Sequence, residues 1–176
     1  MTAALTVSLL GGLRIVAIAG EERFLTTRKH RALLAYLVVN RGRPLPRDRL
    51  ASLLWRDRNE QQARRSLAQA FYDIRRTVCS DRVTLTEQHG AVTLSADSIH
   101  TDLDELTALA GSQGEDALRR ATSIVVGPFL DGLDVDEEPF DQWLRERRES
   151  ARELAISVYS GFASSFLATS NYQCAI

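Results

Sequence analysis

Cysteine is scarce in this sequence of 176 residues, and long apolar runs are absent from it. Cys79 and Cys174 are the only cysteines and occupy unrelated contexts, so the sequence predicts neither a disulfide framework nor a cysteine-based metal site. No apolar run reaches the ~18 residues that a membrane-spanning helix needs. The N-terminus also lacks the basic region, apolar stretch and cleavage site that are typical of a signal peptide. We therefore expect a cytoplasmic protein with no membrane partner.

Motifs for catalysis and metal binding are missing as well. The histidines His30, His89 and His100 form no i, i+4 pair and have no cysteine cluster near them, which argues against zinc. Gly11-Gly12 lacks the remaining glycines of a phosphate-binding loop, and the acidic run 134–138 lacks the spacing of a calcium-binding loop. No serine, histidine and aspartate occur in the context of a nucleophile elbow. The sequence predicts no enzyme, no cofactor and no metal.

The net charge of −1 conceals two halves of opposite sign. Residues 1–100 hold 16 Lys and Arg against 9 Asp and Glu, a balance of +7, whereas residues 101–176 hold 6 against 14, a balance of −8. Chance clustering of solvated charges would give the same counts. The opposite balances nevertheless favour two domains with different partners, because only the basic half could approach a polyanion closely. We expect these domains to span 1–98 and 99–176.

The first domain shows the order of strands, three helices and a β-hairpin. Proline at the start of the second helix suits a position where its missing donor costs nothing, and Asn59 and Gln62 have the spacing of a capping box at the start of the third. This order is typical of an α+β winged helix-turn-helix fold. The expected elements are two strands within 5–18 joined by a tight turn at Gly11-Gly12, a short strand at 23–25, helices over 27–40, 46–55 and 59–78, and hairpin strands at 83–86 and 92–95 around a turn at 88–90.

The second domain is acidic and helical in character. Amphipathic spacing predicts helices over 103–109 and 117–126, a loop over 129–139, and one long helix or two over 140–167. Residues 171–176 resemble the start of a further helix, so we expect this chain to be the N-terminal part of something longer.

The helix expected over 59–78 has two distinct faces. Its apolar face carries residues at i, i+4, i+7 and i+11, namely Leu67, Phe71, Ile74 and Val78. The opposite face, roughly 160° away, has the same spacing and carries what we call the exposed stripe, Arg65, Gln69, Tyr72 and Arg76. Arg64 and Arg75 lie on a shoulder between the faces, and Asp73 is expected to point away from the stripe.

The exposed stripe has the chemistry of a reader of duplex DNA. Arginine can bond guanine in a bidentate manner, glutamine can do the same with adenine, and tyrosine can reach a phosphate or a base edge. A solvated face of an ordinary amphipathic helix would also carry arginines. The absence of acid from the stripe, the flanking helices and hairpin, and the basic balance of the first hundred residues favour double-stranded DNA as the partner.

Several segments of the chain resemble the winged helix of response-regulator type found in SARP-type bacterial transcriptional activators. The segments that carry this resemblance are 10–15 (LGGLRI), 28–37 (RKHRALLAYL), 46–55 (PRDRLASLLW), 63–67 (ARRSL) and 74–76 (IRR). The acidic half resembles the bacterial transcriptional activator domain that follows it, which is similar to tetratricopeptide helical hairpins. The segments concerned there are 127–133 (GPFLDGL) and 140–148 (FDQWLRERR).

The resemblance implies a role for each element. The helix 59–78 would be the recognition helix in the major groove, the hairpin turn would be the wing, and Arg28 and Lys29 would contact phosphate. The helical domain would contact proteins, such as RNA polymerase or a second copy of the chain. The wing departs from the pattern, because its tip carries Glu87, Gln88 and His89 and no Lys or Arg. The expected DNA-binding residues are Arg28, Lys29, Arg47, Arg64, Arg65, Ser66, Gln69, Tyr72, Arg75, Arg76, Gln88 and His89.

A second function of a different class remains open. The basic helix could dock on an acidic protein partner, with the chain serving as a regulatory module at the front of a larger signalling protein such as a cyclase or an ATPase-containing regulator. The near-neutral isoelectric point favours this alternative, whereas the composition of the exposed stripe favours DNA.

Overall fold

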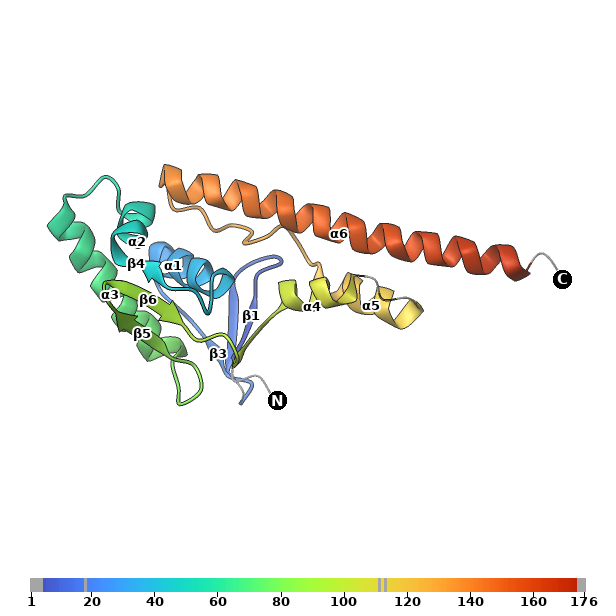
Figure 1. Cartoon of the computed structure of the whole chain (residues 1–176), viewed down its shortest axis with the longest axis horizontal. Helices are drawn as coiled ribbons and strands as arrows, with labels where there is room; N and C mark the ends of the chain where they lie inside the picture. The colour runs from blue at the N-terminus through green and yellow to red at the C-terminus, as the bar shows by residue number, and fades with distance from the viewer. Residues whose placement is uncertain (1–4, 18, 111, 113, 174–176) are drawn as a thin grey trace.

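The computed structural model describes residues 5–17, 19–110, 112 and 114–173, with 165–173 as backbone only. The described strands are β1 (Leu5–Ser8), β2 (Arg14–Ala17), β3 (Glu22–Arg23), β4 (Leu45–Pro46), β5 (Leu85–Gln88), β6 (Ala91–Leu94) and β7 (Ile99–Thr101). The described helices are α1 (Arg28–Val39), α2 (Arg47–Leu54), α3 (Glu60–Val78), α4 (Asp102–Leu109), α5 (Glu115–Ile124) and α6 (Glu138–Gln173). Figure 1 shows α6 running along one side of the molecule, past α1 and α2 and then past α4 and α5. No helix within the described ranges is long and apolar enough to cross a membrane.

The N-terminal sheet has the strand order β3-β2-β1-β7. Strands β1, β2 and β3 pair antiparallel as the alternation of apolar residues predicts. Strand β7 pairs parallel with β1, with Leu5 opposite Ile99, and the sequence pattern did not indicate it. The tight turn expected at Gly11-Gly12 was wrong, because the connection spans residues 9–13. There the Gly11 amide donates to the Pro128 carbonyl over 2.9 Å, so this segment binds the acidic half.

Local capping explains where the helices of the winged helix begin. The Thr27 side chain accepts a hydrogen bond from the His30 amide, and Asn59 Oδ1 accepts one from the Gln62 amide over 2.9 Å. Helix α2 starts beside Pro46, as expected, but Pro46 is its N-cap and does not lie in its first turn. It lies in β4 opposite Ala91 of the hairpin, where its fixed φ suits an extended edge.

The wing is a hairpin of β5 and β6 joined by a two-residue turn. His89 and Gly90 have φ values of 50° and 75°, which fit the turn type that two-residue hairpins prefer. This turn shifts the paired strands from the expected 83–86 and 92–95 to the bounds of β5 and β6. The Arg47 amide donates to the Gly90 carbonyl over 2.9 Å and ties the wing to the start of α2. Three helices followed by this hairpin form a winged helix.

The acidic half is helical, as predicted. A reciprocal capping box between Thr101 and Asp104 begins α4. The segment expected over 140–167 is one helix, α6, which also includes residues 171–173, so the further helix expected there is not separate; 174–176 lie outside the described residues. The loop before α6 is not merely solvated, since Leu130 and Leu133 are buried.

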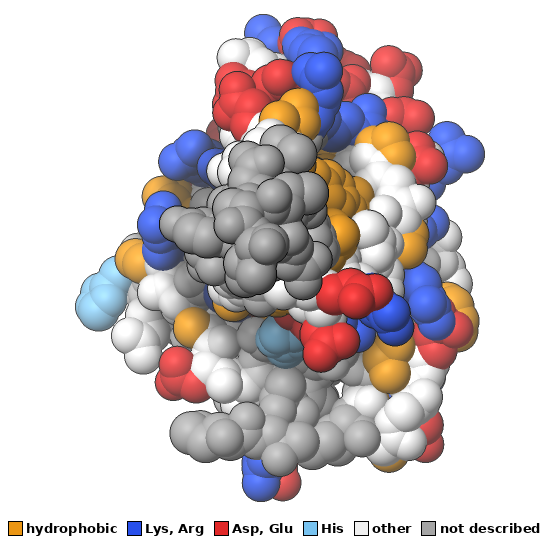
Figure 2. Space-filling view, turned by 90° about the vertical axis from the view of Figure 1, so that its right-hand side faces the viewer, with side chains coloured by type: hydrophobic (Ala, Val, Ile, Leu, Met, Phe, Trp, Pro, Cys, Tyr) orange, Lys and Arg blue, Asp and Glu red, His pale blue; other side chains and the backbone are white. Residues whose placement is uncertain are grey.

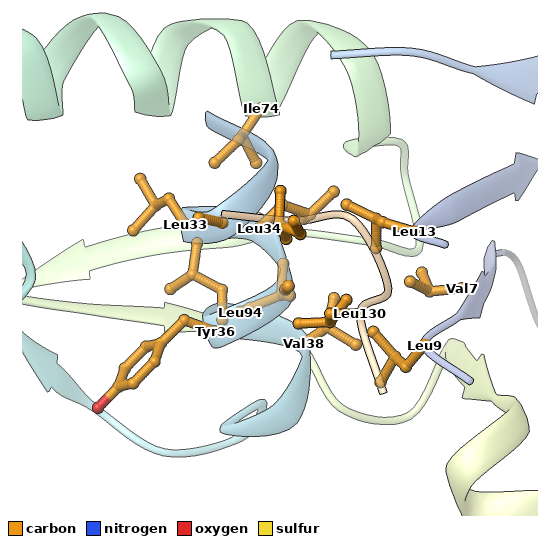
Figure 3. Close-up of a cluster of buried hydrophobic side chains, with 14 of the residues drawn as sticks. Val7, Leu9, Leu13, Leu33, Leu34, Tyr36, Val38, Ile74, Leu94 and Leu130 are labelled. Atoms are coloured by element: carbon orange, nitrogen blue, oxygen red, sulfur yellow. The ribbon is translucent and has the colours of Figure 1, made fainter. Parts of the chain in front are cut away.

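One hydrophobic core joins the two halves of the chain. Figure 3 shows Leu130 of the acidic half packed among Leu9 of the N-terminal sheet and Val38 of α1. A second set of contacts centres on Trp143 of α6, whose ring lies 5.0 Å from that of Tyr36 in α1, centroid to centroid. Because aromatic pairs add to the free energy of simple burial, α6 is held firmly against α1.

Phe140→Ala should destabilise both halves of the chain together. Phe140 is fully buried and its ring lies 5.1 Å from that of Trp143, so its truncation should lower the free energy of unfolding by about 3–5 kcal/mol in one transition. Urea denaturation followed by circular dichroism measures this loss. Ile156→Ala, at a side chain that is 51% exposed, is the control and should change stability by no more than about 0.5 kcal/mol. Two separate transitions, of which one is unshifted, would contradict a shared core.

Candidate nucleic-acid interface

Helix α3 presents two faces as its sequence predicts. Its buried residues are Ala63, Leu67, Ala70, Phe71, Ile74 and Val78, which fix the helix against the core. All four residues of the exposed stripe are exposed, and Tyr72 is 58% exposed. Asp73, beside the stripe, is only partly exposed. The side chains of Arg65 and Arg76 make no hydrogen bond or ion pair with any residue that the structure describes. Both guanidinium groups are therefore available to a ligand.

The position of Asp73 corrects the sequence interpretation. Asp73 does not point away from the exposed stripe, because its Oδ1 accepts a hydrogen bond from Gln69 Nε2 over 3.1 Å. Residues four apart on a helix are neighbours, so the two side chains meet one turn apart. His30 Nδ1 also lies 3.0 Å from Asp73 Oδ2, without the geometry of a hydrogen bond. Asp73 thus occupies one of the two donors of the Gln69 amide, and the second donor and Oε1 stay available to a base edge.

Arg28 and Lys29, adjacent at the start of α1, have different environments. Arg28 is exposed, and no ion pair joins it to a described residue. The Lys29 ammonium instead forms an ion pair with the Glu137 carboxylate, whose side chain is only 4% exposed. Glu137 also accepts the backbone amide of Arg56 over 3.3 Å. Lys29 therefore serves the contact between the two halves of the chain, whereas Arg28 has no ion-pair partner among the described residues.

Arg64 and Ser66 lie beside the exposed stripe near the start of α3. Arg64 pairs with Glu60 over 2.6 Å and lies 3.6 Å from Asp48, and its side chain is more than half exposed. Surface pairs of this kind are worth little and exchange readily with solvent or with another anion. Ser66 Oγ accepts a hydrogen bond from Arg58, a residue of the α2–α3 loop that the sequence analysis did not single out.

Two expected DNA-binding arginines converge on one carboxylate of the wing. Arg47 at the start of α2 and Arg75 of α3 both form ion pairs with Glu87 of β5. Both guanidinium groups also lie over the Phe71 ring, with their carbons 5.2 Å and 6.0 Å from its centroid. We call these four residues the arginine–glutamate cluster. The hydrogen bond from Arg75 and the charge of Arg47 hold the pKa of Glu87 below its ordinary value.

Gln88 and His89 lie exposed at the wing, and the tip between β5 and β6 carries no cation of its own. The cations that pair with the wing are Arg47 and Arg75 of the arginine–glutamate cluster. The face toward which the C-terminal end of α6 points carries interspersed acidic and basic side chains (Figure 2). The stripe of α3 is therefore the better candidate for a polyanion.

The comparisons with known proteins agree with this geometry. Residues 20–90, which include α1, α2, α3 and most of the wing, match the family described as "Transcriptional regulatory protein, C terminal". No curated protein matches the sequence. The solved structure of Mycobacterium tuberculosis EmbR in complex with a low-affinity phosphopeptide is similar, with a TM-score of 0.70 and 25% sequence identity. The similarity covers 97% of this chain and 48% of that one, so the chain spans about half the length of the EmbR structure. Both findings support a winged helix of the kind found in transcriptional regulatory proteins.

Lys29→Ala should reduce stability rather than DNA affinity. The substitution leaves the Glu137 carboxylate buried with the Arg56 amide as its remaining partner, and the free energy of unfolding should fall by on the order of 3 kcal/mol. Arg28→Ala, one residue away and without such a partner, is the matched control and should leave stability within about 0.5 kcal/mol. Urea denaturation of both variants measures the difference, and equal stability of the two would refute the assignment of Lys29.

Glu87→Gln should flatten the dependence of stability on pH. Because the folded state lowers the pKa of Glu87 from its ordinary 4.5, its charge stabilises the fold above that pH, and the contribution is lost as the pH falls through the folded value. The wild type should therefore lose more stability than the variant on acidification below pH 4.5, and the variant should be the less stable at neutral pH. Denaturant titrations at several pH values measure this, and parallel profiles would count against the cluster. Glu115→Gln is the control, because Glu115 also forms an ion pair but its side chain is 67% exposed.

Proposed function

We propose that this chain binds double-stranded DNA in a sequence-specific manner and activates transcription, with α3 as its recognition helix. The observation that carries the proposal is the exposed stripe of α3, where Arg65 and Arg76 have no partner among the described residues. Unpaired arginines on an exposed helix face suit an incoming polyanion, because no internal ion pair has to be broken first. The match of residues 20–90 supports the same function.

Readout of sequence would come from the exposed stripe itself. Arg65 and Arg76 can each take a guanine in a bidentate manner, and Gln69 can take an adenine through Oε1 and the donor that Asp73 leaves free. Tyr72 projects into solvent between them and can reach a phosphate or a base edge. The stripe therefore offers donors and acceptors for base edges along about three turns of helix.

Anchoring to the DNA backbone would come from residues around the stripe. Arg28 at the start of α1 and Arg64 beside Glu60 would contact phosphate, since Arg28 is unpaired among the described residues and the pairs of Arg64 lie in solvent. Ser66, Gln88 and His89 can donate hydrogen bonds to phosphate but add no full charge. Lys29 is left out of this set because Glu137 holds it.

The acidic half would contact proteins rather than DNA. Its balance of 6 Lys and Arg against 14 Asp and Glu over residues 101–176 would repel phosphate. A surface for RNA polymerase or for a second copy of the chain fits that role, and such pairing would raise the local concentration of winged helices on paired sites. We retain 1–98 and 99–176 as the two functional parts. DNA binding would place the protein in the bacterial cytoplasm.

A protein-interaction module is the second candidate function. The chain spans about half of the EmbR structure, and that structure contains a phosphopeptide, so a basic helix that docks on an acidic partner within a larger protein is a specific alternative. The two functions differ in ligand. Duplex DNA bound by α3 should show the steep salt dependence of counterion release, with log affinity falling by about 0.9 per phosphate contacted for each unit of log salt.

Arg65→Ala or Gln69→Ala should relax sequence preference, whereas Arg28→Ala should weaken all duplexes equally. Loss of a base contact costs about 1–3 kcal/mol on the preferred site alone, because random sequence never offered that contact. A phosphate contact carries no sequence information. Fluorescence anisotropy with a selected and a random duplex, at several salt concentrations, measures both effects.

The design separates the candidate functions. If Arg65→Ala and Gln69→Ala, like Arg28→Ala, lose the same affinity on selected and random DNA, α3 is excluded as the reader of sequence. Failure of the wild type to bind any duplex at low salt would exclude the DNA function and favour the interaction module.

A further inference from the structure

The arginine–glutamate cluster has the geometry of an anion site that is already filled. Arg47 comes from α2 and Arg75 from α3, and each bonds a different oxygen of the Glu87 carboxylate: Arg47 Nη1 contacts Oε2, and Arg75 Nη2 contacts Oε1. The side chains of Arg47, Arg75 and Glu87 are 29%, 42% and 33% exposed. The site is therefore formed within the protein but open to solvent.

A DNA phosphodiester and a carboxylate present the same features to two guanidinium groups. Each is a monoanion with two terminal oxygens that share the charge, and arginine forms its strongest hydrogen bonds with such oxygens. Either group can bond one arginine through each of its oxygens. A phosphodiester can therefore replace the carboxylate without moving the arginines. Glu87 occupies the place where a phosphate of the DNA backbone would fit.

The surrounding structure holds the two arginines in position when the carboxylate leaves. The Phe71 ring, which is buried, lies under both guanidinium groups. The backbone of Arg47 is fixed independently, because its amide donates to Gly90 and the preceding β4 pairs with β6. Departure of Glu87 would leave two charges on a stable platform.

We propose that Arg47 and Arg75 form a phosphate-binding subsite for the DNA backbone, which the Glu87 carboxylate occupies in the free protein. The inference rests on the proposed function. The phosphate would displace Glu87 where α2, α3 and the wing meet. The wing, which carries no cation at its tip, would thus act on DNA by releasing arginines of the neighbouring helices. Its carboxylate would lower affinity for every sequence alike, because a backbone contact carries no base information.

Glu87→Gln should therefore tighten binding. The neutral amide no longer competes, so affinity should rise by about three- to tenfold at low salt, by the same factor on selected and random duplexes. The salt slope should steepen by about 0.9, because the variant brings one more net positive charge to the phosphates of the duplex. Fluorescence anisotropy over a salt series measures both. Arg75→Ala in the Glu87→Gln background should remove the gain and the added slope.

Glu105→Gln is the matched control. Glu105 of α4 is likewise paired with an arginine, Arg120, and its side chain is 24% exposed, but it lies in the acidic half. This variant should leave affinity and slope unchanged. A gain of the same size there would show a general effect of net charge and would overturn the subsite.

A second measurement separates this inference from the proposed function. Titration of Glu87→Gln with inorganic phosphate, followed through the arginine side-chain NMR signals, should perturb Arg47 and Arg75 at lower phosphate concentration than in the wild type.

Phosphate binding there without any duplex binding would support the subsite and exclude the DNA function. Duplex binding that Glu87→Gln weakens or leaves unchanged, in a variant that circular dichroism shows to be folded, would mean that Glu87 only positions the wing and would overturn the subsite while the DNA function stands. Neither phosphate nor duplex binding would overturn both.

Discussion

The backbone of residues 9–11 is the point on which the arrangement of the whole molecule depends. The amides of Leu9 and Leu10 donate to the Asp102 carboxylate over 2.8 Å, and the Leu9 carbonyl accepts the amide of Leu130 over 2.7 Å. Burial raises the pKa of Asp102, and hydrogen bonds from the backbone amides of Leu10, Leu9, Leu103 and Asp102 itself work against that shift. This short connection after β1 thus binds α4 on one side and the 128–131 loop on the other. These bonds fix α4 and the 128–131 loop against the end of β1, in addition to the core that the two halves share.

Local sequence patterns predict the elements that depend on neighbours in the chain. The two faces of α3 follow from its periodicity, and the starts of α1 and α3 follow from Thr27 and Asn59, because each signal lies within a few residues of the structure that it determines. The wing is predicted for the same reason, although its strands shift once the two-residue turn is known. These elements make up most of the candidate interface.

Contacts between distant residues could not be predicted in this way. Strand β7 is three residues long and becomes a strand only because β1, more than ninety residues earlier, pairs with it. Lys29 looks like a free cation in sequence, yet Glu137 lies 108 positions away and neutralises it. The arginine–glutamate cluster draws on three elements, and the only local signal for it was that the wing carries a glutamate where a cation would be expected. The interface is thus predictable in outline, while the availability of each charge is decided by tertiary contacts.

The length of α6 gives the Trp143 contact a mechanical consequence. The helix has 36 residues, which at 1.5 Å per residue makes a rod of about 54 Å. Its first turns pack against α1 through the Trp143 and Tyr36 rings, while its far end extends past α5 (Figure 1). The helix is held a second time along its length, because Val158 and Phe162 are buried and the Tyr159 hydroxyl donates to the Ala121 carbonyl of α5 over 3.5 Å. Two separate points of attachment make α6 a strut, so a load on the helix is shared between α5 and the Trp143 contact with α1, and reaches the winged helix through α1.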